Sequence, residues 1–339
     1  MNELLKAEHL SVSFFTDAGE VEAVRDVSFT VEKGEVLAIV GESGWCGKSA
    51  LCKSIMKLLP KTAKIKSGKI LVNGADITDY TEKNMSRLRG ELFSMVFQDP
   101  MTSLNPTITV GKQIGEAVRI HNKKMSRGQI RKRVIELMQL VEIDRPEERI
   151  RQYPHEFSGG MRQRAVMAIA LAGNPKILFA DEPTTALDVT IQAQILDVFR
   201  RIQKKLEMAT VFISHDLGVV AGVADRVAVM YAGKIVEIGT AEEIFYDPRH
   251  PYTWGLLQSL PVLSEGKEWL PTLPGMPPTL IHPPKGDAFA ERNVYAMKID
   301  YEKEPPMFRI TDTHYAATWL LDERAPKVKV PTGGRRDGK

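Results

Sequence analysis

The sequence predicts an α/β fold, with strands buried on both faces and helices between them. Residues 36–40 and 177–181 are uninterrupted apolar runs of the kind found in parallel strands. The first run precedes a glycine-rich turn and a helical pattern, and the second ends in the acidic pair Asp181-Glu182. Ser-Gly-Gly at residues 158–160 opens another helix, whose first amides are therefore little covered by side chains. These features favour a protein that holds an anion at strand ends and helix N-termini.

The composition limits the classes of protein to which the chain can belong. The chain has 339 residues, enough for one large domain or two moderate ones, and its net charge of +3 gives no reason to expect a nucleic-acid partner. The N-terminus is too acidic for a secretory signal, and no apolar run approaches the ~20 residues that cross a bilayer. Cys46 and Cys52 are too few for a disulfide framework or a four-thiolate metal site. We expect a reduced cytoplasmic protein.

The first eighty residues alternate short strands with one helix. Further strands are expected at residues 7–14, 23–31 and 69–72, the last followed by an Asn73-Gly74 turn. A helix is expected over residues 49–59, ended by Pro60.

Residues 107–152 have a helical pattern, in which Ser126 and Gln129 show the spacing of a capping box. Six basic side chains gather there: Lys123, Lys124, Arg127, Arg131, Lys132 and Arg133. We interpret them as a solvated helix face rather than a nucleic-acid surface, because no aromatic residues are interleaved with them.

The last third of the chain changes in character. A helix over residues 191–206, a strand over 210–214 and a hairpin over 227–238 are expected first. Six of the fourteen residues from 271 to 284 are proline, which favours an extended path. Residues 248–330 therefore predict a separate C-terminal domain, and residues 331–339 a flexible tail.

Residues 41–49 read Gly-Glu-Ser-Gly-Trp-Cys-Gly-Lys-Ser, between a strand and a helix. A phosphate loop has the pattern G-x-x-x-x-G-K-[ST]: its amides wrap the phosphates, its lysine supplies charge and its hydroxyl binds magnesium. Here five residues, not four, separate Gly41 from Gly47, and removing Trp45 would restore the spacing. The residues expected to contact ATP are Gly41, Glu42, Ser43, Gly44, Cys46, Gly47, Lys48, Ser49 and Ala50.

The extra residue leaves three interpretations open. It can be a change introduced into the sequence, or a bulge that turns the Trp45 ring outward and keeps the function. The third interpretation is a loop that no longer binds nucleotide.

Asp181 and Glu182 predict two different roles. Asp181 suits a magnesium contact opposite Ser49, whereas Glu182 suits the general base that polarises a water against the γ-phosphate. A surface acidic pair that merely caps a strand is the alternative, and the buried run before it and Pro183 after it oppose that interpretation.

Three further positions are candidates. His215 follows a strand and is placed to contact the γ-phosphate or the attacking water. Gln98, also after a strand, is placed to sense magnesium and that water. Phe14 or Phe15 would stack on an adenine ring, although an aromatic on an edge strand usually only packs.

The order of these motifs resembles the ATP-binding cassette (ABC) ATPases over roughly residues 5–245. The resemblance implies an ATPase domain over residues 1–247, with a RecA-like mixed sheet, an antiparallel β subdomain and a helical subdomain near residues 100–165. In this family two cassettes meet head to tail, so signature residues of one complete the ATP site of the other. The matching residues are Ser158, Gly159, Gly160 and Gln163, with Asp188 in the D-loop.

Residues 97–106, 250–253 and 289–319, with the proline-rich region around 274–275, resemble the ATPases of oligopeptide and dipeptide importers. The resemblance implies ATP and Mg²⁺, and a peripheral position on the cytoplasmic face of the membrane. Its implied partners are a second, related but different ATPase, two membrane-spanning permease subunits and an extracellular peptide-binding protein. Many such proteins ligate an iron–sulfur cluster through cysteines in the region that matches the C-terminal domain expected here. The matching positions here hold Asn293, Asp300 and Thr318, so no cluster is expected.

Two other functions stay open. The altered loop would permit a non-hydrolysing or degenerate cassette in the same kind of transporter. A soluble ABC protein acting on ribosomes or DNA fits poorly, because such proteins generally carry two cassettes or a long coiled coil. Residues 49–157, between the phosphate loop and the signature, contain no long heptad run.

Overall fold

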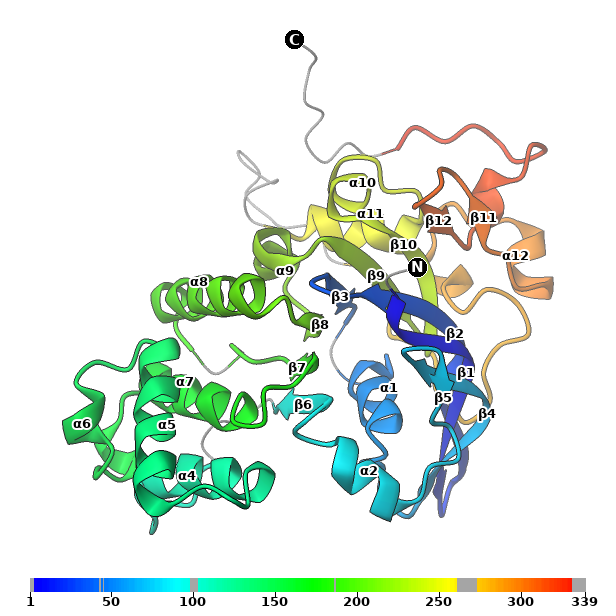
Figure 1. Cartoon of the computed structure of the whole chain (residues 1–339). Helices are drawn as coiled ribbons and strands as arrows, with labels where there is room; N and C mark the ends of the chain where they lie inside the picture. Colours follow the sequence, from blue (N-terminus) through cyan, green and yellow to red (C-terminus); the bar gives the residue numbers. More distant parts are fainter. Residues whose placement is uncertain are drawn as a thin grey trace. The chain divides into compact units, whose positions relative to one another are not determined.

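The computed structural model describes residues 3–42, 44, 46–97, 103–185, 187–260 and 273–330 (Figure 1). The chain divides into two compact units. The helical unit comprises Met1–Leu4, Val31–Val36 and Asp79–Ile213. The phosphate-loop unit comprises Leu5–Thr30, Leu37–Thr78 and Ser214–Lys339.

Three neighbouring strands of the helical unit run parallel to one another. They are β6 (Phe93–Val96), β7 (Ile177–Asp181) and β8 (Ala209–Ser214), with β7 paired to both neighbours. Every residue of β7 and β8 is buried, as the apolar runs predict. Because the strands are parallel, their carboxyl ends lie at one edge, where Asp181 is opposite Ile213.

The helices of the helical unit lie between residues 79 and 213. Their bounds are α2 Glu82–Leu88, α4 Val110–His121, α5 Arg127–Leu140, α6 Pro146–Arg149, the 3₁₀ turn η1 Pro154–Glu156, α7 Gly159–Ala170 and α8 Val189–Leu206. Helix α4 contacts α5 and α7, and α7 contacts α8 (Figure 1). The predicted capping box at the start of α5 is confirmed, since the Ser126 hydroxyl accepts from the Gln129 amide and the Gln129 side chain accepts from the Ser126 amide.

The phosphate-loop unit contains antiparallel and mixed pairing. One sheet has the order β2 (Gly19–Glu32), β1 (Glu3–Thr16), β4 (Ala63–Val72) and β5 (Ala75–Asp76). Elsewhere β3 (Val36–Val40) runs parallel to β9 (Arg226–Tyr231), which forms the predicted hairpin with β10 (Lys234–Thr240). The predicted α/β fold with an antiparallel sheet is therefore confirmed.

The helices of this unit are α1 Lys48–Ile55, α9 Leu217–Val223, α10 Ala241–Tyr246, α11 Pro251–Gln258 and α12 Lys298–Glu302, with 3₁₀ turns η3 Ala290–Arg292 and η4 Trp319–Leu321. Helix α1 ends earlier than Pro60 would require. Lys57 has a φ of 52° and the Leu58 amide donates to the Lys53 carbonyl, which is a left-handed C-terminal cap. The cap, and not the proline, ends the helix.

The C-terminal residues join this unit through its sheet. Strand β12 (Tyr315–Ala316) pairs with β10 on one side and with β11 (Phe308–Arg309) on the other. Residues 273–284, the described part of the proline-rich stretch, contain no helix or strand. Residues on both sides of position 247 belong to the phosphate-loop unit, so the expected domain boundary there stays a prediction. The expected tail, 331–339, lies outside the described residues.

Candidate nucleotide site

The two ends of the phosphate loop are fixed by close backbone packing. A Cβ on Gly41, just after β3, would lie 2.2 Å from the carbonyl oxygen of Met230. A Cβ on Gly47, just before α1, would lie 2.0 Å from the carbonyl oxygen of Ala23, and Gly47 has a φ of 80°. Only glycine fits at either end, and for Gly47 the backbone conformation adds a second reason.

Lys48 closes the loop across the extra residue. Its side chain is buried, and its ammonium donates to the carbonyl oxygens of Gly41 at 2.6 Å and Glu42 at 2.8 Å. The inserted residue therefore does not prevent Lys48 from contacting the first two residues of the loop. Ser43 and Trp45 lie outside the described residues.

Helix α1 begins at Lys48 without a side-chain cap, because its N-cap is Gly47. Ser49 and Ala50 are half-buried in its first turn. A helix start of this kind directs backbone amides and the positive end of its dipole toward an anion. Cys46 is buried beside it, and burial raises the pKa of its thiol, so this cysteine is not activated as a nucleophile.

Two residues that the sequence did not indicate hold Glu42. Its amide donates to the Tyr252 hydroxyl at 2.8 Å, and its carboxylate pairs with the Arg292 guanidinium. More than 200 residues separate these side chains from the loop, so no local pattern could have revealed them. The only sequence signal was the resemblance of residues 250–253 and 289–319 to peptide-importer ATPases.

The acidic pair lies where the sequence predicts it. Asp181 is the last residue of β7 and is buried, whereas Glu182 is half-buried. Glu182 has a φ of 47°, a conformation that costs a non-glycine residue ~1–3 kcal/mol and is common at functional sites. The Thr185 hydroxyl donates to Glu182 Oε2 at 2.9 Å, and the Glu182 amide donates to the Ile213 carbonyl. These bonds aim the carboxylate, which suits a general base.

The other predicted positions differ in how far the structure describes them. His215 is exposed directly after β8, and Asp216 behind it caps α9. Phe14 lies half-buried in β1 opposite Ala63, while Phe15 is more exposed and has the ammonium groups of Lys64 and Lys66 over its ring. Gln98 lies outside the described residues. The roles of these residues remain predictions.

The signature stretch forms the N-terminus of α7. Ser158 is the N-cap, with its hydroxyl accepting from the Met161 amide, and Gly159 beside it is exposed. A Cβ on Gly160 would come within 2.7 Å of the Ile191 side chain in α8, so a larger residue there would force that side chain to shift.

The expected role of Gln163 toward the ATP of a partner cassette stays a prediction. This side chain is 0% exposed, and neither its amide nitrogen nor its oxygen has a hydrogen-bond partner among the described residues. It lies on the inner face of α7 with Gly160 and Met167, at helical spacings of three and four residues.

Asp188 is exposed and caps α8, since its carboxylate accepts from the Ile191 amide at 2.9 Å. Val189 next to it is strongly exposed. Ala186 lies outside the described residues.

Comparisons with known proteins identify the family. The sequence model of the ABC transporter family matches residues 24–185, and that of the oligopeptide/dipeptide transporter C-terminal region matches residues 236–299. The chain is 60% identical to the oligopeptide transport ATP-binding protein OppD of Bacillus subtilis, over 98% of this chain and 92% of the relative. It is 57% identical to the dipeptide transport ATP-binding protein DppD of Lactococcus lactis, over 96% and 93%. The chain belongs to the ABC transporter family, among its oligopeptide and dipeptide transport ATP-binding proteins.

Solved ABC proteins share the fold. The cbiO1 subunit of the cbiONQ ABC transporter from Clostridium perfringens aligns with a TM-score of 0.63 and 30% identity, over 72% of this chain and 91% of that one. A dimeric ABC cassette named MJ0796, described as a post-hydrolysis state bound to ADP and Pi, aligns with a TM-score of 0.62 and 24% identity, over 70% and 98%. The predicted resemblance to the ABC ATPases is confirmed.

In this ABC protein the three positions expected to match cluster cysteines have local structural roles. Asn293 accepts from the Tyr295 amide, Asp300 from the Met297 amide and Thr318 from the Leu320 amide. All three are buried. Each side chain therefore completes a turn of its own backbone. Within the described residues no helix is long and apolar enough to cross a membrane.

Proposed function

We propose that this chain is the ATP-hydrolysing subunit of a transporter that imports oligopeptides or dipeptides. The single observation that supports this most is the identity to oligopeptide and dipeptide transport ATP-binding proteins over nearly the whole length of both chains. The chain keeps the parts that hydrolysis needs: Lys48 for the phosphates, an oriented Glu182 and a helix start at residues 158–160.

The chemistry assigned to each residue follows from its position. Lys48 and the amides at the start of α1 bind the phosphates, and Phe14 faces the adenine. Magnesium prefers oxygen ligands, which the Ser49 hydroxyl and the buried Asp181 carboxylate offer, with Gln98 as a third. Bound magnesium supplies positive charge that neutralises the phosphates. Glu182 accepts a proton from the attacking water, and His215 orients that water.

The proposed assembly has two cassettes. The exposed helix start at Ser158 and Gly159 serves the ATP of a second, related ATPase, and Asp188 with the exposed Val189 lies in the surface toward it. Two membrane-spanning permease subunits form the pore, and an extracellular binding protein delivers the peptide. This chain then lies on the cytoplasmic face of the membrane, bound to the permeases.

The inserted residue in the phosphate loop favours one competing proposal, a cassette that binds its partners but does not hydrolyse. The contacts from Lys48 to Gly41 and Glu42 argue against it, because the ends of the loop already meet.

Uptake by cells tests the proposal. Cells lacking this chain are supplied with the wild type or with Lys48→Met, and entry of a labelled dipeptide and a labelled hexapeptide is measured. We expect wild type to restore uptake of at least one peptide and Lys48→Met to restore none. Equal uptake with both would support the non-hydrolysing cassette, and no uptake of either peptide with the wild type would contradict peptide import.

A further inference from the structure

The C-terminal region reaches the phosphate loop through Arg292. Its Nη1 donates to Glu42 Oε2 at 2.6 Å and its Nη2 to Glu42 Oε1 at 2.8 Å. The Arg292 side chain is 4% exposed. Two parallel bonds from a guanidinium to a carboxylate fix direction as well as distance.

Arg292 is itself held on its other sides. Its Nε donates to the Pro274 carbonyl at 2.7 Å, and Nη1 also reaches the Tyr231 hydroxyl at 3.3 Å. The guanidinium lies 5.6 Å from the centre of the Tyr231 ring and 5.9 Å from that of Phe289. With these contacts the arginine is a fixed anchor, and Glu42 of the loop is the group that it positions.

Tyr252 provides a second anchor on the same residue. Its hydroxyl accepts from the Glu42 amide, and its buried ring packs against Tyr231 and Phe289, with ring centres 4.6 Å and 5.4 Å away. Glu42 is thus bound through both its backbone and its side chain by the C-terminal half of the chain.

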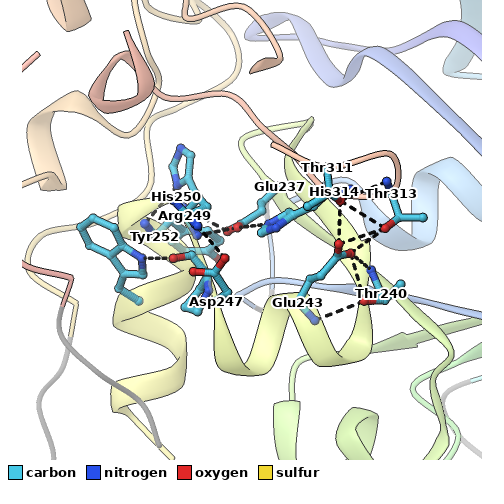
Figure 2. A network of polar contacts seen from close by, with 12 residues as sticks. Glu237, Thr240, Glu243, Asp247, Arg249, His250, Tyr252, Thr311, Thr313 and His314 are labelled. Atoms are coloured by element: carbon cyan, nitrogen blue, oxygen red, sulfur yellow. Dashed lines mark hydrogen bonds and ion pairs between the residues drawn. The ribbon is translucent and has the colours of Figure 1, made fainter. Parts of the chain in front are cut away.

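A buried polar network holds the start of α11, where Tyr252 lies (Figure 2). The Tyr252 amide donates to His250 Nδ1 at 3.0 Å, and the His250 amide donates to Glu237 Oε2 at 3.0 Å. Glu237 Oε1 lies 2.8 Å from His314 Nε2 and accepts from the Arg249 amide. Glu237 and His314 are both fully buried. Their contact therefore connects the start of α11, which carries Tyr252, with His314 in the segment before β12.

Charge gives this arrangement a function. A phosphate loop attracts an anion, and a carboxylate in its second position opposes that attraction. We propose that Arg292 and Tyr252 are positioning residues for ATP binding: Arg292 neutralises and fixes the Glu42 carboxylate, and Tyr252 fixes the Glu42 backbone. They act through Glu42 and not through contact with the reacting atoms. The inference depends on the ATP site proposed above.

Nucleotide affinity of the full-length chain tests the proposal, with fluorescent mant-ATP as the probe. In Arg292→Met the Glu42 carboxylate loses its partner, and we expect the Kd to rise by at least about tenfold. Tyr252→Phe removes the acceptor for the Glu42 amide, together with a hydrogen bond of the same hydroxyl to Cys46 in the loop, and we expect a rise of about three- to tenfold. Arg226→Met is the matched control. Arg226 is also a part-buried arginine, and it donates to the Thr30 carbonyl. It lies at the start of β9, whereas Tyr231, which contacts Arg292, lies at the end of that strand. The Kd of Arg226→Met should stay within about twofold of the wild type.

The double variant Glu42→Gln/Arg292→Met separates charge neutralisation from simple support. If Arg292 acts through the charge of Glu42, removing that charge restores the Kd to within about threefold of wild type. A double variant that binds as weakly as Arg292→Met would overturn the proposal, as would wild-type affinity in Arg292→Met itself. In the assembled transporter, Arg292→Met should raise the KM for ATP and leave kcat nearly unchanged. No binding of mant-ATP by the wild type would instead contradict the proposed ATP site, so the two failures are distinct.

Discussion

The ammonium of Lys48 lies 2.6 Å from the carbonyl oxygen of Gly41, seven residues earlier, although the loop between them is one residue longer than a phosphate loop requires. A loop of altered length need not lose its function when its two ends remain joined. Packing against Met230 and Ala23 fixes those ends independently of the residues between them.

Deleting Trp45 tests whether the insertion matters. Because the ends of the loop already meet, we expect the deletion to change the Kd for ATP by less than about fivefold in either direction. Isothermal titration of both full-length chains measures this. Failure of the wild type to bind, together with tight binding by the deletion variant, would show that the insertion inactivates the site.

Gly47 and Gly74 form a matched pair for testing the loop's packing. Both have φ near 80°, but a Cβ on Gly47 would meet the Ala23 carbonyl at 2.0 Å, whereas one on Gly74 has open space. We expect Gly47→Ala to weaken ATP binding more than tenfold, because the loop or α1 must shift. Gly74→Ala should cost ~1–2 kcal/mol of folding free energy, because alanine is disfavoured at this positive φ, and should leave the Kd unchanged. Equal affinities in the two variants would contradict the packing argument.

Glu182→Gln removes the proposed general base while keeping its shape. Since a positioned base contributes ~10²–10⁴-fold, we expect kcat for ATP to fall by that factor, equivalent to roughly 3–5 kcal/mol in the barrier. The Kd for ATP should change little. Glu207→Gln is the control, because Glu207 also has a positive φ but lies at the end of α8 and pairs with Lys33. A Glu182→Gln assembly that turns over ATP at the wild-type rate would remove Glu182 from the mechanism.

Asp287 predicts a pH dependence of stability. Burial, with smaller contributions from the charges of Asp300 and Glu304, raises the pKa of Asp287 to about 6, although the hydrogen bond from the Phe289 amide and, to a smaller extent, Lys234 partly offset this. Its Oδ2 has no hydrogen-bond partner among the described residues, while Oδ1 accepts from the Phe289 amide. The folded state therefore favours the protonated form. Stability from this group is complete below the unfolded pKa of ~3.9 and is lost as pH rises through about 6.

Replacing Asp287 by Asn keeps the Oδ1 acceptor and removes the ionisation. We expect Asp287→Asn to increase the free energy of unfolding at pH 8 by ~1–3 kcal/mol, with the gain shrinking toward pH 4. Urea unfolding at pH 5, 6.5 and 8 measures this, with the exposed Asp17→Asn as control. A gain that is the same at all three pH values would show that ionisation of Asp287 is not its cause.

Much of the site could be predicted because it depends on local patterns. An apolar run ending in Asp181 and Glu182 must form a buried strand with its carboxylates at the end, and it does. Ser126 and Gln129 form a capping box because that motif needs only its own four residues. The same holds for the helix start at Ser158.

The remaining features depend on contacts that no local pattern encodes. The pairing of Arg292 with Glu42 joins positions 250 residues apart. The end of α1 at Ile55 depends on the left-handed conformation of Lys57, a residue that is not glycine. The burial of Gln163 likewise depends on which face of α7 packs inward, which the order of the signature residues does not encode.

The most direct test of the central claim is one preparation of the assembled transporter in lipid vesicles, in which ATP hydrolysis and uptake of a labelled peptide are measured together. Our account predicts that the wild type shows both activities and that Glu182→Gln in this chain reduces both while the chain still binds ATP. Peptide uptake at the wild-type rate with ATP hydrolysis abolished would contradict it.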